Sequence, residues 1–450
     1  MRRHTLAHCA AAEQNRDCVH AMTGTVHAHT LRNGMLVLLR EVHSAPLATS
    51  WIWYRVGARN EAPGFTGISH WVEHMLFKGT PQIPGRDLDR LIARNGGTFN
   101  GFTSHDYTAY FETLPADRIE LGLRIESDRM INAVFEDHEV ESERTVILAE
   151  REGYENDAEW WLNEAVMAAA FQIHPYRNEV IGWRDDLLTL TRERLFAHYQ
   201  TFYRPNNAVL VLVGDFDSAT MLRYVERYFG SLPAGPALPP LHWREPEQQG
   251  ERRVIVRRPG PAQYVQIAYH AVDCRHPDFA ALLVLDAVLS GAKSLSFGGG
   301  AQTNRSARLY RALVETRLAS YASSGFRPSY DPHLFEFHAM VQDGRSVDEV
   351  ERALLNEIVV MQNHGPRADE LARVLKQMRA QIAYSHESVT NQALMLGMWE
   401  MLDHYGRAGS LLDEIAAVRA EDVRHAAQTY LVERRRTVGY FVPTTTPGDP

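Results

Sequence analysis

The run from His70 to His74 places two imidazoles four residues apart, with the carboxylate of Glu73 beside the second of them. At about 100° per residue of α-helix, the two imidazoles lie about 40° apart on one helix face, and Glu73 lies about 60° from His70 on the other side. Two neutral imidazole nitrogens one helical turn apart can bind a divalent metal ion such as zinc. The spacing therefore predicts a metal site with a carboxylate that reaches a water molecule at the metal.

The same pattern has a purely structural alternative. The chain contains 21 histidines, and two histidines on one helix are often only a hydrogen-bonded surface pair. The short motif alone is suggestive, so a third ligand has to decide between the two interpretations. A catalytic zinc of this kind takes two histidines, one glutamate and an open position for water.

A second segment, from about residue 137 to residue 152, offers candidate carboxylates. Glu143 and Glu150 are seven residues apart, so they share a helix face within about 20°. The apolar residues 146–148 lie between them and pack the segment. Taken alone, this stretch is typical of a solvated acidic helix, and the residues leave both interpretations open.

Together these residues resemble the pattern of the pitrilysin family of zinc peptidases, which carry the inverted motif His-x-x-Glu-His. Within that family the chain is most similar to the smaller members related to the mitochondrial processing peptidase and their bacterial homologues. The resemblance extends from about residue 26 to about residue 442. Further matching text occurs in the family's order, in the segments 67–80, 96–110, 143–150, 174–183 and 203–215.

The resemblance implies a role for each residue of the motif. It implies that His70, His74 and Glu150 bind one zinc ion per chain. Glu73 would act as the general base, and Glu143 would lie near the metal as a supporting carboxylate. The implied activity is that of a zinc-dependent metalloendopeptidase acting on peptides or unfolded polypeptide segments.

The resemblance also implies where a peptide substrate binds. Asn100, Gly101 and Phe102 fall where family members line the cleft and contact the peptide backbone. Such a substrate would add to the sheet as a β-strand, with weak sequence selectivity. Family members usually carry Ala at the position of Gly101, a difference that is expected to loosen the strand edge.

One part of the implied site is missing from this chain. Family members often complete the substrate clamp with an Arg and a Tyr from the second half of the chain. Here Val314 stands where the Arg is expected, and Tyr321 or Ser320 stands at the Tyr position. We therefore expect the chain to work as a homodimer or as a heterodimer with a related chain. The alternatives are a non-catalytic or partner-dependent subunit of such a peptidase, and a zinc-storage or zinc-sensing protein.

Length and composition narrow the class of protein. The 450 residues are too many for one ordinary core and predict two to three domains. A hydrophobic content of 45% and a net charge of −9 are typical of a soluble globular protein without a nucleic-acid partner. The glycine-rich segment 298–305 lacks the Gly-Lys-Ser/Thr of a phosphate-binding loop, so we expect a flexible loop. The sequence contains no uninterrupted run of about 18 apolar residues, so it predicts no membrane span.

The N-terminal residues and the cysteines bear on location. Cys9, Cys18 and Cys274 make no disulfide framework. Residues 1–21 begin with basic residues but lack the apolar core of a secretory signal. We expect these residues to be a disordered N-terminal extension, with Met22 as a candidate for the true start. A cytoplasmic location is the resulting expectation.

The sequence pattern predicts the same order of strands and helices twice along the chain. A proline-rich linker at 233–250 separates the catalytic zinc-binding half, 22–232, from an inactive half, 251–450, that lines the cleft. Aligning Gly79 with Gly291 sets three residues of the second half, Leu282, Leu285 and Asp286, against His70, Glu73 and His74. We predict an α/β (α+β) fold with two homologous α/β sandwich halves. Each half would be a β-sheet with helices on one face, and the family resemblance implies that the halves form a clam-shell.

Overall fold

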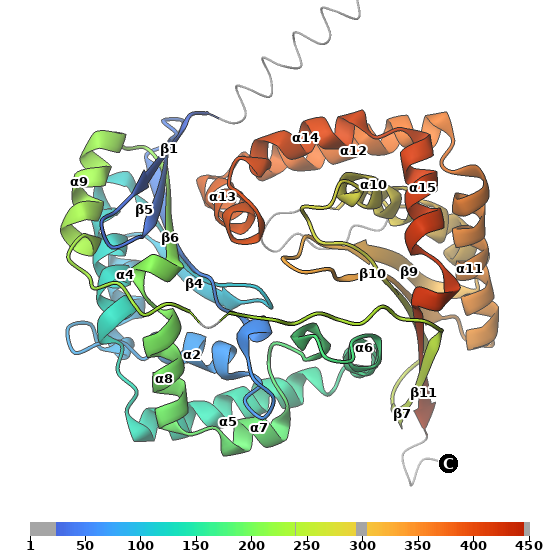
Figure 1. Cartoon of the computed structure of the whole chain (residues 1–450), viewed down its shortest axis with the longest axis horizontal. Helices are drawn as coiled ribbons and strands as arrows, with labels where there is room; N and C mark the ends of the chain where they lie inside the picture. The colour runs from blue at the N-terminus through green and yellow to red at the C-terminus, as the bar shows by residue number, and fades with distance from the viewer. Residues whose placement is uncertain (1–23, 239, 294–303, 445–450) are drawn as a thin grey trace, which may run out of the picture.

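The computed structural model describes residues 24–238, 240–293 and 304–444, and within them two β-sheets are surrounded by helices (Figure 1). This is the predicted α/β architecture with two sheet-and-helix halves. The predicted N-terminal extension, the candidate start at Met22 and most of the glycine-rich segment 298–305 lie outside these residues. No helix in the described part of the chain is both long and apolar enough to cross a lipid bilayer.

The first sheet has six strands in the order β1-β2-β6-β3-β5-β4. Strands β2 and β6 are parallel, and all other neighbours are antiparallel. A turn at Asn33-Gly34 joins β1 to β2, with Gly34 at a φ of 88° that favours glycine. In chain order the strands are β1 (Val26–Thr30), β2 (Leu36–Glu41), β3 (Leu47–Tyr54), β4 (Thr98–Thr103), β5 (Thr108–Pro115) and β6 (Ala208–Gly214).

The second sheet repeats this topology. Its order β7-β11-β8-β10-β9 has one parallel pair, β7 with β11, followed by antiparallel neighbours. This order and these directions match β2-β6-β3-β5-β4 of the first sheet, so the internal repeat predicted from the sequence is visible in the strand connections. The strands are β7 (Arg252–Pro259), β8 (Tyr264–His270), β9 (Ala319–Phe326), β10 (Leu334–Val341) and β11 (Arg436–Thr444). The division at residues 232 and 251 stays a prediction.

Helices of the first half pack on one face of the first sheet. Because strand side chains alternate between faces, Ile52, Tyr54 and Leu210 point into this helical layer and are fully buried. The helices of this half are α2 (Ile68–Leu76), α3 (Gly85–Arg94), α4 (Glu120–Asn132), α5 (Asp137–Tyr154), α6 (Ala158–Ala170), α7 (Arg184–Thr189), α8 (Arg192–Phe202) and α9 (Ser218–Phe229). Helix α6 instead lies beside β7 and β11 of the second sheet (Figure 1).

The second sheet has a helical layer of the same kind. Ile267 and Phe337 point into it and form one apolar core with the surrounding helices. The helices of this half are α10 (Phe279–Ser290), α11 (Val347–His364), α12 (Ala368–Ser385), α13 (Val389–Leu402), α14 (Arg407–Ala417) and α15 (Ala420–Tyr430).

Two helices cross between the halves and cover the inner sheet faces. Helix α13 packs on β3 and β6 of the first sheet, and α6 packs on β7, β8 and β11 of the second (Figure 1). The approach is close in both places. A Cβ at Gly397 of α13 would lie 2.1 Å from the Trp53 ring, and a Cβ at Gly439 of β11 would lie 2.4 Å from Val166 of α6. Each sheet therefore carries its own helices on one face and one helix of the other half on the opposite face.

Candidate metal centre

Helix α2 carries the His-x-x-Glu-His motif and begins at a specialised turn. Gly67 precedes it with a φ of 83°, and a Cβ there would lie 2.5 Å from the carbonyl oxygen of Ile181. The buried carboxylate of Glu61 accepts the backbone N–H groups of Gly67 and Ser69, at 2.9 Å each, and so caps the helix. The apolar face, with Trp71 fully buried, packs into the core. The opposite face is left to the two motif histidines.

The structure brings the three predicted metal ligands together. Nε2 of His70 lies 3.2 Å from Nε2 of His74, and Oε2 of Glu150 lies 3.7 Å and 3.6 Å from these two nitrogens. Ligands at about 2.0–2.1 Å in a tetrahedron are about 3.3 Å apart, so this donor set fits one zinc ion with a fourth position open. Among the described residues, no other group of three His, Cys, Asp or Glu side chains has ligand atoms this close together.

The environment sets the protonation of the two histidines in opposite ways. Burial, and then the neighbouring His74, lower the pKa of His70 to about 3, so its imidazole is neutral near pH 7. Burial also lowers the pKa of His74, but the hydrogen bond to Glu143 and the surrounding carboxylates outweigh it and raise that pKa overall. A metal ion at Nε2 of His74 would replace a proton there.

Glu143 contacts the imidazole of His74 at the nitrogen that faces away from His70 and Glu150. Its Oε1 lies 2.7 Å from Nδ1 of His74, and its other oxygen pairs with the ammonium of Lys78. This carboxylate is 5% exposed, so His74 and Lys78, rather than water, provide its polar contacts. A carboxylate on the far nitrogen of a ligating histidine orients the ring and fixes its tautomer. Glu143 lies beside the proposed ligand His74, and its role as a supporting carboxylate stays a prediction; Lys78 was not recognised from the sequence.

Glu73, the proposed base, is 7% exposed and lies next to the ligand cluster. The hydroxyl of Thr103, the last residue of β4, donates to its Oε2 at 2.6 Å. Burial raises the pKa of the Glu73 carboxyl, and this hydrogen bond opposes the rise. A carboxylate with a raised pKa is a better proton acceptor near neutral pH than an exposed one.

Tyr154 contacts Glu150, and Trp160 stacks on Tyr154. The hydroxyl of Tyr154 donates to Oε1 of Glu150 at 3.1 Å, which leaves Oε2 toward the histidines. The Tyr154 ring stacks on Trp160, with ring centroids 6.3 Å apart. Trp160 in turn lines a cavity of about 510 Å³ between the halves, together with His105, Glu179 and side chains of β10. Tyr154 could have been found from the sequence, because it lies one helical turn after Glu150.

The predicted substrate-binding strand β4 forms one edge of the first sheet. It pairs only with β5 among the described strands, so its other edge can accept a chain in extended conformation. A Cβ at Gly101 would lie 2.8 Å from the Tyr110 ring and 2.9 Å from the Phe77 ring. Glycine therefore lets these rings pack against the strand. Phe102 faces Trp53 edge-on, with ring centroids 5.9 Å apart, and Oδ1 of Asn100 accepts the N–H of Gly101.

Tyr321, the remaining predicted site residue, lies on β9 of the second sheet. Its hydroxyl donates to Oγ of Ser323 at 2.8 Å, and no contact in the described residues joins it to the metal ligands. Val314 ends a single π-helical turn before that strand. The role of Tyr321 in substrate binding stays a prediction.

The matching helix of the second half, α10, has a different chemistry. Leu282 and Leu285 are fully buried in the apolar core. Asp286, which aligns with His74, accepts hydrogen bonds from Lys293 at 2.7 and 2.6 Å and from Ser324 at 2.6 Å. The ammonium group of Lys293 therefore neutralises Asp286, the one carboxylate among the three aligned positions of α10.

Family models match two adjoining segments of the chain. The family described as insulinase (peptidase family M16) matches residues 36–183, which include the proposed metal ligands, and the family described as the peptidase M16 inactive domain matches residues 189–378. The chain belongs to peptidase family M16, in agreement with the resemblance seen in its motifs.

Relatives of known name are similar over nearly the whole chain. Subunit beta of the mitochondrial-processing peptidase of Lentinula edodes is 28% identical over 92% of this chain and 89% of its own length. The zinc protease PqqE of Helicobacter pylori is 26% identical, with 92% of each chain covered. Both similarities cover the two halves together.

Solved structures share the fold. A protease from Helicobacter pylori superposes with a TM-score of 0.88 at 24% identity, over 94% of this chain and all of that chain. A structure from Pseudomonas fluorescens titled as a peptidase M16 inactive domain has a TM-score of 0.83 at 18% identity, over 94% and 98% of the two chains. These comparisons confirm the two-half α/β architecture.

Proposed function

We propose that the chain is a zinc metalloendopeptidase that hydrolyses peptides or unfolded polypeptide segments. The observation that carries this proposal is the convergence of His70, His74 and Glu150 on one point beside the buried carboxylate of Glu73. The family, and relatives named zinc proteases, support the same activity. A zinc-storage protein would need neither Glu73 nor an open fourth position.

The side chains around the site have separate tasks in peptide hydrolysis. Bound zinc would polarise the scissile carbonyl and acidify the attacking water. Glu73 accepts the proton of that water and returns it to the leaving amine. Thr103 holds the Glu73 carboxylate in place, and Glu143 fixes the ring of His74. Substrate would lie along the free edge of β4, held by backbone hydrogen bonds, so extended chains are preferred to compact folds.

The second candidate is a subunit that needs a partner chain for activity. Val314 at the expected Arg position favours this candidate, as does the similarity to a subunit of the mitochondrial-processing peptidase. In both cases we propose a homodimer or a heterodimer with a related chain. The cytoplasmic location, and the absence of nucleic-acid and membrane partners, stay predictions.

One assay separates these functions. The purified zinc-loaded chain is sized by light scattering and tested on a quenched, unstructured peptide, with Glu73→Gln as the inactive control. Cleavage by the chain alone supports the endopeptidase. Cleavage that appears only after a related chain is added supports the partner-dependent subunit. Stoichiometric zinc without cleavage under either condition would overturn both.

A further inference from the structure

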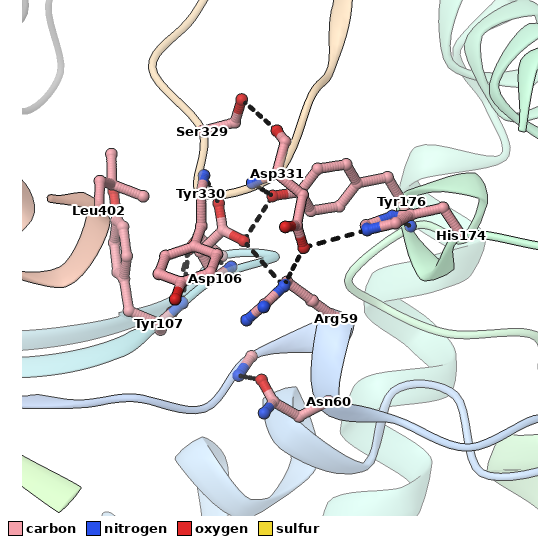
Figure 2. Close-up of polar contacts among 12 residues, drawn as sticks. Arg59, Asn60, Asp106, Tyr107, His174, Tyr176, Ser329, Tyr330, Asp331 and Leu402 are labelled. Atoms are coloured by element: carbon pink, nitrogen blue, oxygen red, sulfur yellow. Dashed lines mark hydrogen bonds and ion pairs between the residues drawn. The ribbon is translucent and has the colours of Figure 1, made fainter. Parts of the chain in front are cut away.

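A buried carboxylate, Asp106, joins the two halves beside the metal centre. It lies in the turn between β4 and β5, and its side chain is 8% exposed. The hydroxyl of Tyr176 donates to its Oδ1 at 2.6 Å, and the backbone N–H of Tyr330 donates to its Oδ2 at 3.1 Å. Figure 2 shows these groups pointing toward one another from different elements. Tyr330 comes from the second half, in the loop between β9 and β10.

The same loop is fastened to the first half through Asp331. Its carboxylate accepts Nε of Arg59 at 2.5 Å and lies 3.1 Å from Nε2 of His174, and its backbone N–H donates to the Tyr176 hydroxyl at 3.1 Å (Figure 2). The Arg59 guanidinium also lies 4.2 Å above the Tyr330 ring. The hydroxyl of Tyr176 is therefore shared, since it donates to Asp106 and accepts from Asp331.

The turn that carries Asp106 is tight. The backbone N–H of Ser104 donates to the carbonyl of Tyr107 at 2.8 Å, and its hydroxyl oxygen accepts the N–H groups of Asp106 and Tyr107. Thr103 precedes this turn directly and donates to Glu73 at 2.6 Å. Only Ser104 and His105 lie between Asp106 and Thr103, so the hydroxyl that holds Glu73 and the carboxylate that joins the halves belong to one short turn.

We propose that Asp106 is a positioning residue for Glu73, acting through Thr103. The loop with Tyr330 and Asp331 holds Asp106 in place, so the second half takes part in this positioning. The inference rests on the proposed function. Its physical basis is the sensitivity of proton transfer to geometry, since a displacement of about 1 Å can lower a rate about 100-fold. The half without metal ligands then contributes to the alignment of the base and not only to the shape of the cleft.

The test is a double-mutant cycle on the zinc-loaded full chain. Tyr176→Phe removes the shared hydroxyl and keeps the ring, and Thr103→Val removes the hydroxyl on Glu73. We expect each change to lower kcat about 10-fold at unchanged zinc content, and the double variant to lose no more than the larger single effect. Thr103→Ser, which keeps a hydroxyl, should restore kcat to near the wild-type value. Single losses that multiply to about 100-fold would overturn the proposal, as would full kcat in Tyr176→Phe.

A matched control and a second readout complete the test. Arg55→Gln breaks another contact between the halves, the 3.0 Å ion pair of Arg55 with Glu400, and should leave kcat unchanged. Hydrogen exchange of the backbone amides of residues 103–108 needs no activity. Faster exchange there in Tyr176→Phe supports the positioning role, and unchanged exchange overturns it. A wild-type chain that cleaves no peptide would instead contradict the proposed function, while the exchange result still decides whether Tyr176 holds the turn.

Discussion

Nδ1 of His74 and Oε1 of Glu143 lie 2.7 Å apart, so the other nitrogen of that imidazole faces His70 and Glu150. Because the carboxylate accepts the Nδ1 proton, the lone pair of the neutral ring is on Nε2, where a metal ion needs it. The ring is held in this orientation before any metal binds. Because Glu143 orients this imidazole without being a proposed ligand itself, its effect on zinc affinity can be measured separately from the effects of His74 and Glu150.

The first prediction concerns zinc content. The chain should hold one equivalent of zinc after exhaustive dialysis, and His74→Ala or Glu150→Gln should lose it. Glu143→Gln should keep the ion but bind it about 10–100-fold more weakly, because it orients a ligand without being one. Metal analysis and competition with a chelator measure both effects. Two tightly held equivalents, or unchanged binding in His74→Ala, would contradict the assignment.

A second prediction separates the base from the ligands. Glu73→Gln should retain one zinc equivalent and lose peptidase activity by several orders of magnitude, since an amide cannot accept the proton. Activity on a quenched peptide and zinc content are measured on the same sample. If zinc disappears together with activity, Glu73 is a ligand, and retained activity would leave the mechanism without a base.

The third prediction tests the packing of α13 on the first sheet. Gly397→Ala should lower the free energy of unfolding by about 1–3 kcal/mol, because the added Cβ would lie 2.1 Å from Trp53. Gly153→Ala is the matched control on another helix, where a Cβ meets nothing within 4 Å. That change should raise the free energy of unfolding by up to about 1 kcal/mol, the helix penalty of glycine. Urea denaturation of the two variants should shift in opposite directions.

Stability should fall in mild acid, with His198 as one cause. Burial lowers the pKa of His198 from 6.5 to about 3 in the folded chain. Between these values the unfolded state binds a proton that the folded state does not, so stability is lost as pH falls below about 6.5. The slope from one such group is about 1.4 kcal/mol per pH unit.

The measurement is the free energy of unfolding between pH 4 and pH 7. His198→Gln should have a shallower slope than the wild type, because it removes one group that takes up a proton on unfolding. His138→Gln is the control, since His138 is 79% exposed, and it should follow the wild-type slope. Parallel slopes for wild type and His198→Gln would contradict the prediction.

Much of the local structure was predictable because its causes are local. Helix α9 begins at Ser218, directly after Asp217, a residue type that favours helix starts and whose side chain accepts the N–H of Thr220. Helical spacing predicts that His70 and His74 share one face of α2 and that Glu143 and Glu150 share one face of α5, whereas grouping Glu150 with the histidines as a proposed metal ligand needed the family pattern. The hairpin at Gly34 follows from a left-handed backbone that glycine favours.

The rest depends on contacts between distant segments. Helix α13 is apolar around most of its circumference because it touches both cores, so no apolar stripe indicates the sheet it covers. Thr103 bonds to Glu73 across 30 residues, and Tyr176 bonds to Asp106 across 70. A single threonine or tyrosine in a sequence carries no sign of such a partner, which appears only when the chain is folded.

The crossing of α6 and α13 also bears on how the chain acquires its structure. Val166 of α6 is synthesised well before the strand it covers, β11, which is the last strand in the described residues. Until α13 is made, the emerging first half exposes Trp51 and Trp53 of its sheet, and until β11 is made it exposes the apolar side of α6. Contacts between residues so far apart in sequence slow folding and leave apolar surface exposed, which promotes aggregation. Neither half can reach its final state during synthesis without the other, so chaperones that shield apolar surface should matter for the yield of this protein.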